Sequence, residues 1–307
     1  MSASVRSFPE IVHLSERDSK ISEVQLDLLR EDLIHPHISG NKYRKLKYNL
    51  QKAERLNKKV LLSFGGAYSN HISALAYAGK KYGFQTIGVI RGEELASHSK
   101  LNPTLSFAKS CGMQLHFISR QEYQEKHTSE YINKLYSKFG NAYILPEGGT
   151  NELAIKGCGE ILSEETTNYD ILAVSVGTGG TMAGIVKASE AHQFVMGFSA
   201  LKGTFQKETI AKFTSKTNYS LDDSFTFGGY GKIDRQLIRF MNDFRRQTKI
   251  TLDPLYTGKM LFGLYTLIRE GAFPKNSRIL AVHTGGLQGI EGMNQKLKKK
   301  NLPQIEQ

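Results

Sequence analysis

The sequence has few cysteines and prolines and lacks any long apolar run. Its 307 residues include only two cysteines, Cys111 and Cys158, and their wide separation makes a metal site or a disulfide framework a poor explanation for either. Seven prolines and 39% hydrophobic residues indicate a substantial buried core rather than extensive disorder. No stretch approaches about 18 uninterrupted apolar residues, so we expect neither a membrane span nor a membrane partner.

Residues 1–20 also lack the apolar core and the small-residue cleavage site of a secretory signal, and we therefore expect a cytoplasmic protein. The formal net charge is +12, from 41 Lys and Arg against 29 Asp and Glu. Such an excess can favour nucleic acid, anionic membranes or anionic small molecules. Part of it lies in the tail at 296–304, most simply a solvated helix end, and no zinc-finger spacing or heptad array supports DNA binding. Charge alone leaves open an enzyme with an anionic ligand and a non-catalytic basic protein that binds phosphate or RNA.

Short apolar runs alternate with amphipathic segments along most of the chain. Strands are expected at 59–66, 85–91, 114–119 and 142–149, and helices at 72–83, 105–112 and 121–140. A second series has strands at 170–176, 194–201 and 278–284, and helices at 152–165, from about 180, near 233–247 and near 258–270. Near-continuous apolar strands separated by helices are typical of parallel sheets covered on both faces. The sequence therefore predicts an α/β protein built from two units.

A glycine-rich turn links a predicted strand to a helix in "SVGTGGTMAG", residues 175–184. Glycines let the backbone approach an anion closely, and the free N–H groups at the helix start point toward it. Phosphate is the favoured occupant, and a tight turn without a ligand is the alternative. Met182 stands where the last glycine of a dinucleotide fingerprint would fall, and no Gly-Lys-Ser/Thr closes a Walker loop, which disfavours NAD and ATP. The candidate phosphate-binding residues are Gly177, Thr178, Gly179, Gly180 and Thr181.

A second polar turn follows a predicted strand in "SFGGAYSNHISALA", residues 63–76. Either Ser69 or Asn70 can simply cap the following helix, and His71 alone carries little weight. A Ser-Asn-His triplet after two glycines nevertheless supplies more polar groups than a cap requires. The surplus indicates a ligand at the carboxyl end of this strand. No Gly-x-Ser-x-Gly elbow occurs, so a hydrolase of that type is not expected.

Three later segments place Tyr or Thr beside glycine: "FTFGGYGKID" (225–234), "LDPLYTGKM" (252–260) and "AVHTGGLQG" (281–289). Tyr230 and Tyr256 are candidate general acids or hydrogen-bond donors. The alternative for each is a packed aromatic with its hydroxyl at the surface. Thr284 begins another glycine turn at the end of the last predicted strand.

Lys42 directly follows a Ser-Gly-Asn turn in "HPHISGNKYRKLKYNL", residues 35–50. The segment is either the start of a solvated basic helix or a lysine aimed at a reactive partner. Pyridoxal phosphate requires an amine for a Schiff base, an anion site for its phosphate and a hydrogen-bond partner for its ring oxygen. Lys42, the glycine turn at 177–181 and Asn70 match these needs, and lysine suits the first because its pKa falls on desolvation.

Five motifs carry a family resemblance: "SGNKYRKL", "GGAYSNH", "GTGGTMAG", "YTGKM" and "HTGGLQG", in that order. From about residue 10 to 295 the chain resembles the D-cysteine desulfhydrase and 1-aminocyclopropane-1-carboxylate deaminase family, a branch of the fold-type-II pyridoxal-phosphate enzymes related to tryptophan synthase β. The resemblance implies two domains, each an open twisted mostly parallel sheet with helices on both faces. It assigns 1–45 and 151–307 to a large cofactor-binding domain, and 46–150 to a small mobile domain that closes over the cofactor. It also implies a homodimer.

The resemblance further implies roles for residues around the cofactor. Lys42 would form the Schiff base, and Lys45 would help residues 177–181 to hold the phosphate. Asn70 would lie against the hydroxyl of the pyridine ring. Tyr68 fills a position where the family has a smaller or amide side chain, a difference that is expected to reshape the pocket.

The same resemblance bears on the substrate and the reaction. Ser69 would lie near the substrate carboxylate, and Tyr230 and Tyr256 would flank the reacting carbon. Directly after the Tyr of the "YTGKM" motif the deaminases carry Glu, where this chain has Thr257. After the His of the "HTGGLQG" motif they carry an apolar residue, where this chain has Thr284. Neutral hydroxyl partners leave the cofactor ring less protonated, which suffices to expel thiolate but is less suited to opening a cyclopropane.

We therefore expect a D-cysteine desulfhydrase-like enzyme acting on a small amino acid. Lys42 would remove the α-proton, thiolate would leave, and pyruvate, ammonia and sulfide would result. The alternative is a 1-aminocyclopropane-1-carboxylate deaminase, which would give α-ketobutyrate and ammonia. The basic surplus would then serve anionic small molecules rather than nucleic acid.

Overall fold

The computed structural model describes residues 9–14, 23–97 and 100–307. Its larger sheet has six strands in the order β1-β2-β10-β7-β8-β9. In that order the strands are Ile11–His13, Gln25–Leu29, Arg278–Val282, Ile171–Val176, Phe194–Ser199 and Tyr219–Asp222. All neighbouring pairs are parallel except β1 and β2, which are antiparallel.

The smaller sheet has four strands in the order β5-β4-β3-β6. These are Gln114–Ile118, Gln85–Arg91, Val60–Gly66 and Tyr143–Leu145, and every neighbouring pair is parallel. The register places Arg91, the last residue of β4, beside Gly66 at the end of β3 and beside Ile118 at the end of β5. The carboxyl ends of these three strands therefore form one edge of the sheet.

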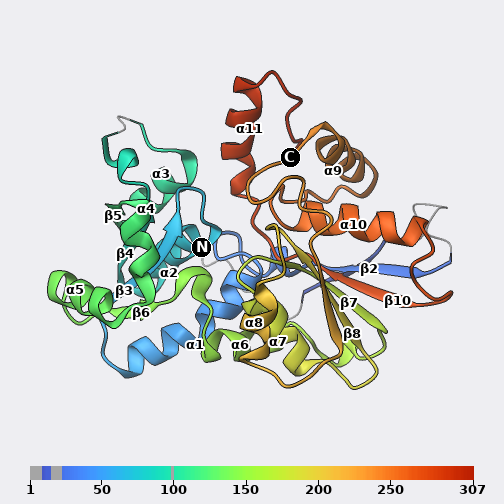
Figure 1. Ribbon diagram of the computed structural model, residues 1–307, viewed down its shortest axis with the longest axis horizontal. Coiled ribbons are helices and arrows are strands. Elements are labelled where there is room, and N and C mark those ends of the chain that lie inside the picture. The colour runs from blue at the N-terminus through green and yellow to red at the C-terminus, as the bar shows by residue number, and fades with distance from the viewer. Residues whose placement is uncertain (1–8, 15–22, 98–99) are drawn as a thin grey trace.

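Helices cover both faces of both sheets. They are α1 Asn41–Arg55, α2 Asn70–Tyr82, α3 Pro103–Ser110, α4 Arg120–Gln124, α5 Ser129–Phe139, α6 Glu152–Gly159, α7 Gly180–Ala188, α8 Gln206–Ala211, α9 Arg235–Thr248, α10 Thr257–Arg269 and α11 Gly289–Lys299. One apolar core joins the large sheet to α9, α10 and α11, and a second joins its other face to α6 and α7. Two further cores lie on the small sheet, one shared with α1, α2 and α3 and one with α4 and α5. Figure 1 shows the small sheet with α2 to α5 on the left and the large sheet on the right.

The predicted α/β class with two mostly parallel sheets is confirmed, because strands such as "ILAVSV" of β7 are buried along nearly their whole length. The division into a large domain (1–45 and 151–307) and a mobile small domain (46–150) stays a prediction. Its first boundary falls within α1, a continuous helix that runs from one sheet toward the other in Figure 1. No helix of the described residues is long and apolar enough to cross a bilayer.

Three of the predicted elements differ from the structure by more than two residues at one end or are interrupted. The predicted helix 121–140 is divided into α4, a 3-10 turn at Glu125–His127, and α5, because the hydroxyl of Thr128 accepts the N–H of Tyr131 and starts a new helix. The predicted helix 152–165 ends at Gly159, and the predicted strand 142–149 ends at Leu145 before a proline. The short elements β1, β2, α8 and β9 were not predicted, since none gives an extended periodic signal.

Candidate functional site

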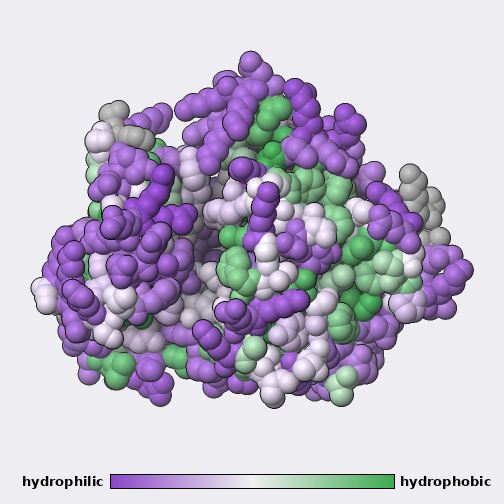
Figure 2. Space-filling model, viewed as in Figure 1, coloured by the Kyte–Doolittle hydropathy of each residue, from purple (hydrophilic) through white to green (hydrophobic). Residues whose placement is uncertain are grey.

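A cavity of about 880 Å³ lies between the carboxyl ends of strands from both sheets. Figure 2 shows the molecular surface hollowed between the parts that carry the two sheets. Loops that follow β3, β6, β7, β8 and β10 supply much of its lining, as expected of ligand sites in parallel sheets. The predicted residues that line it are Lys42, Lys45, Ser69, Asn70, Gly177, Thr178, Gly179, Thr181, Tyr230, Tyr256 and Thr284.

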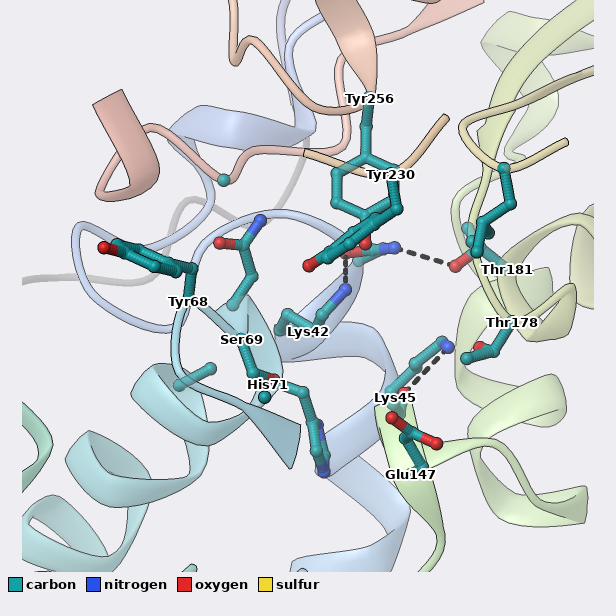
Figure 3. Close-up of a pocket in the computed structure, with 18 of the residues that line it drawn as sticks. Lys42, Lys45, Tyr68, Ser69, His71, Glu147, Thr178, Thr181, Tyr230 and Tyr256 are labelled. Atoms are coloured by element: carbon teal, nitrogen blue, oxygen red, sulfur yellow. Dashed lines mark hydrogen bonds between the residues drawn. The ribbon is translucent and has the colours of Figure 1, made fainter. Parts of the chain in front are cut away.

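Lys42 enters this cavity from the first turn of α1. The preceding Gly40 has a φ of +57°, and a Cβ there would lie 2.0 Å from the carbonyl oxygen of Thr284. The N–H of Asn41 donates to that same carbonyl at 3.3 Å. Glycine is therefore required for the loop after β10 to press against the turn, and this contact fixes where α1 begins. The amine of Lys42 donates to the side-chain oxygen of Asn41 at 2.9 Å (Figure 3).

The surroundings of Lys42 favour its neutral form. Burial, followed by the nearby charge of Lys45, lowers the pKa of the Lys42 amine from 10.5 to about 7, whereas the carboxyl of Asp253 acts in the opposite direction. No carboxylate of the described residues pairs with this amine. A neutral amine is a nucleophile and a base, which is what Schiff-base chemistry requires.

The glycine turn at 177–181 and Lys45 give another part of the cavity wall the chemistry of an anion site. The turn at 177–181 leads from β7 into α7, with Gly179 in the left-handed region at a φ of +86°. Lys45 is buried, and its amine donates to the carbonyl of Gly148 at 2.9 Å and to the hydroxyl of Thr150 at 3.2 Å. The hydroxyls of Thr150 and Thr178 are 2.8 Å apart. Free backbone N–H groups, a helix N-terminus and a buried ammonium together suit a phosphate.

The same turn is packed closely against its neighbours. A Cβ on Gly180 would lie 2.6 Å from the hydroxyl oxygen of Thr150, and a Cβ on Gly177 would lie 3.1 Å from the ring of Tyr256. Thr181 accepts a hydrogen bond of 2.8 Å from the amide of Asn41, which ties the turn to the helix that carries Lys42. A hydrogen bond between Asn41 and Thr181 therefore links the first turn of α1, which carries Lys42, to the glycine turn.

The loop between β3 and α2 contributes the polar triplet. The hydroxyl of Ser69 accepts the N–H of Ile72 at 3.3 Å and caps α2, so its capping role is real. The amide oxygen of Asn70 accepts from the side chain of Gln288 at 2.5 Å. Both side chains also line the cavity, and Ser69 lies beside Lys42 in Figure 3.

His71, in contrast, is a buried neutral ring. Its Nε2 lies 2.9 Å from the hydroxyl of Ser63, and burial, followed by Lys42 and Lys45, lowers the pKa of His71 to about 3. Its Nδ1 has no hydrogen-bond partner among the described residues. The ring therefore adds no positive charge to the cavity at neutral pH.

Tyr68 turns away from Lys42 and toward α11 in Figure 3. Lys296 of α11 lies 3.7 Å above the centre of the Tyr68 ring, a cation–π contact. A Cβ on Gly292, one turn earlier, would lie 2.8 Å from the same ring. Tyr68 thus forms part of the cavity wall on the α11 side.

Tyr230 and Tyr256 lie together above Lys42 in Figure 3, with ring centres 6.2 Å apart. Burial, followed by the neighbouring Tyr230, raises the pKa of Tyr256 well above its ordinary value. Burial also raises the pKa of Tyr230. Both phenols stay protonated at neutral pH and can donate hydrogen bonds or protons, but they cannot serve as bases.

Two predicted residues do not line the cavity, namely Gly180 and Thr257. Gly180 faces Thr150, and the side chain of Thr257 is fully buried with no partner for its hydroxyl among the described residues. Thr284 does line the cavity, and its hydroxyl lies 3.2 Å from that of Ser175 at the end of β7. Where the ends of β7 and β10 meet the cavity, the lining therefore presents the hydroxyls of Ser175 and Thr284.

Sequence reasoning missed Asp253. One carboxyl oxygen accepts the N–H groups of Leu255, Tyr256 and Thr257 at 3.1, 2.7 and 3.3 Å, and the other has no partner among the described residues. Burial raises the pKa of Asp253 to about 7, although these N–H groups and Lys42 oppose the rise. An aspartate just before a predicted helix was the available signal, since it is typical of a cap.

Lys259 of the "YTGKM" string was also missed. Its buried amine donates to the carbonyls of Thr226 and Gly229 at 2.7 and 2.9 Å. Burial lowers the pKa of Lys259 to about 8. This lysine therefore holds the glycine-rich loop that carries Tyr230.

Comparisons with known proteins agree with this geometry. Residues 11–285 match the family described as "Pyridoxal-phosphate dependent enzyme". A Pyrococcus furiosus protein with a provisional 1-aminocyclopropane-1-carboxylate deaminase name is 30% identical over 88% of this chain and 87% of its own length. An Arabidopsis thaliana protein named as a bifunctional mitochondrial D-cysteine desulfhydrase/1-aminocyclopropane-1-carboxylate deaminase is 27% identical over 94% of this chain and 78% of its own. A crystal structure described as an "ACC deaminase homologue" superposes with a TM-score of 0.83 at 26% identity, over 96% of this chain and 94% of that one.

Proposed function

The chain belongs to the pyridoxal-phosphate dependent enzymes, and from this premise we propose that it removes the β-substituent of a small D-amino acid. The reaction would be that of a D-cysteine desulfhydrase, which converts D-cysteine to pyruvate, ammonia and sulfide. The residues around the cavity fit the cofactor: an amine at Lys42 with a lowered pKa, an anion site at 177–181, and the amide of Asn70 beside Ser69 at the start of α2.

The observation that carries the proposal is that no carboxylate of the described residues lines the cavity near Lys42; the buried Asp253, whose charge acts on Lys42, is not among the lining residues. At the ends of β7 and β10, the described residues that line the cavity present the hydroxyls of Ser175 and Thr284. The carboxylates that line the cavity in the described part of the chain, Glu94 and Glu147, belong to its outer wall. A ring nitrogen that faces hydroxyls stays less protonated than one that faces a carboxylate, and this weaker electron sink suffices to expel a thiolate.

When bound, pyridoxal phosphate supplies an electron sink that stabilises negative charge at the substrate α-carbon. The protein residues would bind the cofactor and the substrate and transfer protons. Lys45 and the start of α7 would hold the phosphate, and Ser69 would bind the substrate carboxylate. The amine of Lys42 takes the α-proton, because its lowered pKa leaves a large neutral fraction at pH 7. Tyr230 and Tyr256 donate hydrogen bonds near the leaving group.

A second candidate activity is the deamination of 1-aminocyclopropane-1-carboxylate to α-ketobutyrate and ammonia. It is favoured by the names of the Pyrococcus and Arabidopsis relatives, one of which has both activities in its name. The two candidates share the α-carboxylate and the amine of the substrate, and differ in the bond that must break. They are therefore separated by product analysis rather than by binding.

The first experiment adds pyridoxal phosphate to the purified protein and records its visible absorption. We expect a band from the bond between cofactor and lysine, and its loss in Lys42→Ala. Lys47→Ala is the matched control, since Lys47 lies on the same helix but pairs with Glu160 at 2.6 Å outside the cavity lining. A protein that stays colourless, or a Lys42→Ala variant that keeps the band, would contradict the assignment of Lys42.

The second experiment measures pyruvate from D-cysteine and L-cysteine, and α-ketobutyrate from 1-aminocyclopropane-1-carboxylate. We expect pyruvate from D-cysteine above both other activities. Turnover of the cyclopropane substrate alone would overturn the proposed desulfhydrase activity in favour of the second candidate. Loss of both activities in Lys42→Ala, but not in Lys47→Ala, should accompany either outcome.

We further propose a cytoplasmic homodimer whose segment 46–150 closes over the bound substrate; these features rest on the family resemblance. Sedimentation should give about twice the mass of 34.4 kDa. Small-angle scattering of the holoenzyme should show compaction when a substrate analogue is added. A monomer in sedimentation, or an unchanged scattering profile, would reject the corresponding feature.

A further inference from the structure

The outer wall of the cavity carries charges that a small substrate does not need. The cavity of about 880 Å³ has to hold both the cofactor and the substrate, and its lining also includes charged residues that have been assigned to neither. Beyond Ser69 and Tyr230 its lining continues over the ends of β4 and β5 and the first turns after them. The charged and aromatic residues of this outer wall are Arg91, Glu94, Arg120, Tyr123, Lys126 and Glu147.

Two of the three cations in this wall are already neutralised. Arg120 pairs with Glu94 at 2.9 Å. Lys126 lies 3.5 Å from Glu147. Arg91, by contrast, has no carboxylate within ion-pair distance among the described residues, and its guanidinium contacts an aromatic ring. The wall is thus left with one full positive charge, and that charge is on Arg91.

The guanidinium of Arg91 is held in place without being neutralised. It lies 5.5 Å from the ring centre of Tyr123, a cation–π contact that orients a cation and leaves its charge intact. Tyr123 is itself fixed, since it is only 3% exposed and its hydroxyl donates to Glu147 at 2.8 Å. Lys126 lies over the same ring at 4.8 Å. We call this group of Arg91, Tyr123 and Lys126 the Arg91 subsite.

Backbone geometry brings the guanidinium next to the substrate loop. Arg91 ends β4 and pairs in register with Gly66, which begins the loop that carries Ser69. One guanidinium nitrogen lies 3.6 Å from where a Cβ of residue 66 would stand, an ordinary contact distance, so the guanidinium lies against the start of this loop. Burial raises the pKa values of Tyr123 and Tyr230, and the positive charge of Arg91 opposes this rise in both, whereas Arg91 is not among the charges that act on Lys42. Arg91 is therefore near the leaving-group side of the cavity and removed from the reacting amine.

We propose that the Arg91 subsite binds a carboxylate at the far end of the substrate's β-substituent, an inference that rests on the proposed β-elimination. The substrate class is then a D-cysteine whose sulfur carries a short arm ending in a carboxylate, and D-cysteine itself is the truncated form. The Cβ–S bond breaks, sulfur leaves with the electron pair as a thiolate, and the α-proton passes to Lys42. One water molecule completes the balance, giving pyruvate, ammonia and a mercapto acid.

Equilibrium binding tests the subsite without turnover. D-2-aminoadipate has the length of S-carboxymethyl-D-cysteine with carbon in place of sulfur, and D-homoglutamine is its neutral amide. Calorimetry on the holoenzyme should show that the acid binds about tenfold more tightly than the amide, because a hydrogen bond between charged groups is stronger than a neutral one. Arg91→Gln should abolish this preference, and Arg91→Lys should retain part of it. Arg246→Gln is the matched control and should keep the preference, since Arg246 pairs with Glu306 at 2.6 Å and is not among the residues that line the cavity.

Turnover provides the second measurement. The ratio of kcat/KM for S-carboxymethyl-D-cysteine over S-carbamoylmethyl-D-cysteine should be about ten in the unmodified enzyme and near one in Arg91→Gln. Equal binding of aminoadipate and homoglutamine by the unmodified enzyme would overturn the subsite even if no variant folds. A preference for the acid over the amide that survives in Arg91→Gln would also overturn the Arg91 subsite. If D-cysteine gives no pyruvate, the proposed desulfhydrase function is wrong. If D-cysteine does give pyruvate but the enzyme binds aminoadipate and homoglutamine equally, only the Arg91 subsite is wrong.

Discussion

Asp253→Asn probes a buried carboxyl whose ionisation opposes folding. Asp253 is 1% exposed, and one of its oxygens accepts three N–H groups at the start of α10. Burial raises its pKa from 3.8 to about 7. An asparagine oxygen can accept the same three N–H groups, so the substitution keeps the cap and removes the titration. The change is therefore almost purely one of charge.

The expected magnitude follows from the two pKa values. Between pH 3.8 and about 7 the folded protein binds a proton at Asp253 that the unfolded chain has released, so stability falls as the pH rises through this window. Each pKa unit corresponds to about 1.4 kcal/mol, and the raised pKa thus costs at most about 4 kcal/mol above pH 7. The cost is absent below about pH 4, where the carboxyl is protonated in both states. The Asp253→Asn variant would carry no such cost at any pH, because an amide does not titrate.

Urea unfolding of the protein without cofactor, followed by circular dichroism at pH 5 and pH 8, measures this effect. The free energy of unfolding of the variant relative to the unmodified protein should rise by about 3 kcal/mol between the two pH values. Asp234→Asn is the matched control, because the exposed Asp234 also caps a helix by accepting the N–H of Leu237. A difference for Asp253→Asn that is the same at pH 5 and pH 8 would refute the reasoning, whatever its size.

Three further predictions concern the surroundings of the cavity. Arg44→Met should lower the free energy of unfolding by about 3–5 kcal/mol in urea, because it leaves Glu31 buried and unpaired, and adding Glu31→Gln should restore part of the loss. Gly180→Ala should weaken pyridoxal-phosphate binding in an absorbance titration, since its Cβ would lie 2.6 Å from the Thr150 hydroxyl; unchanged affinity would contradict the assignment of the phosphate site. In the protein without cofactor, acylation of Lys42 followed by mass spectrometry should increase as the pH rises through about 7, and a rise only near pH 10 would show that the amine is not desolvated.

The sheets were predictable because their signal is local. The run 170–176 predicts a buried strand from composition alone, and β7 occupies Ile171–Val176. The glycine turn that follows needs no distant partner to be recognised, since a left-handed residue before a helix selects glycine directly, as at Gly179. Local rules therefore place the strands and the glycine turn that follows β7.

Elements stabilised from a distance were not predictable. β2 contains the buried Asp27, which breaks the apolar pattern of its strand. The structure compensates this carboxylate with the hydroxyl of Tyr169 at 2.6 Å and the ring of His13 at 2.7 Å, from two separate segments. The sequence of residues 25–29 does not indicate that Tyr169 and His13 will contact Asp27, so the pattern of apolar residues alone does not predict this strand.

The candidate site shows the same limit in its electrostatics. Sequence identifies cations and carboxylates but not which of them neutralise one another. Arg91 is left with its charge only because Arg120 and Lys126 meet Glu94 and Glu147 in the folded wall, and those partners come from different loops. A charge that survives such pairing is available to a ligand, whereas a paired one has already exchanged its solvation for a protein contact. The net charge of +12 therefore says little about recognition, and the guanidinium beside the substrate loop, unpaired among the described residues, says more.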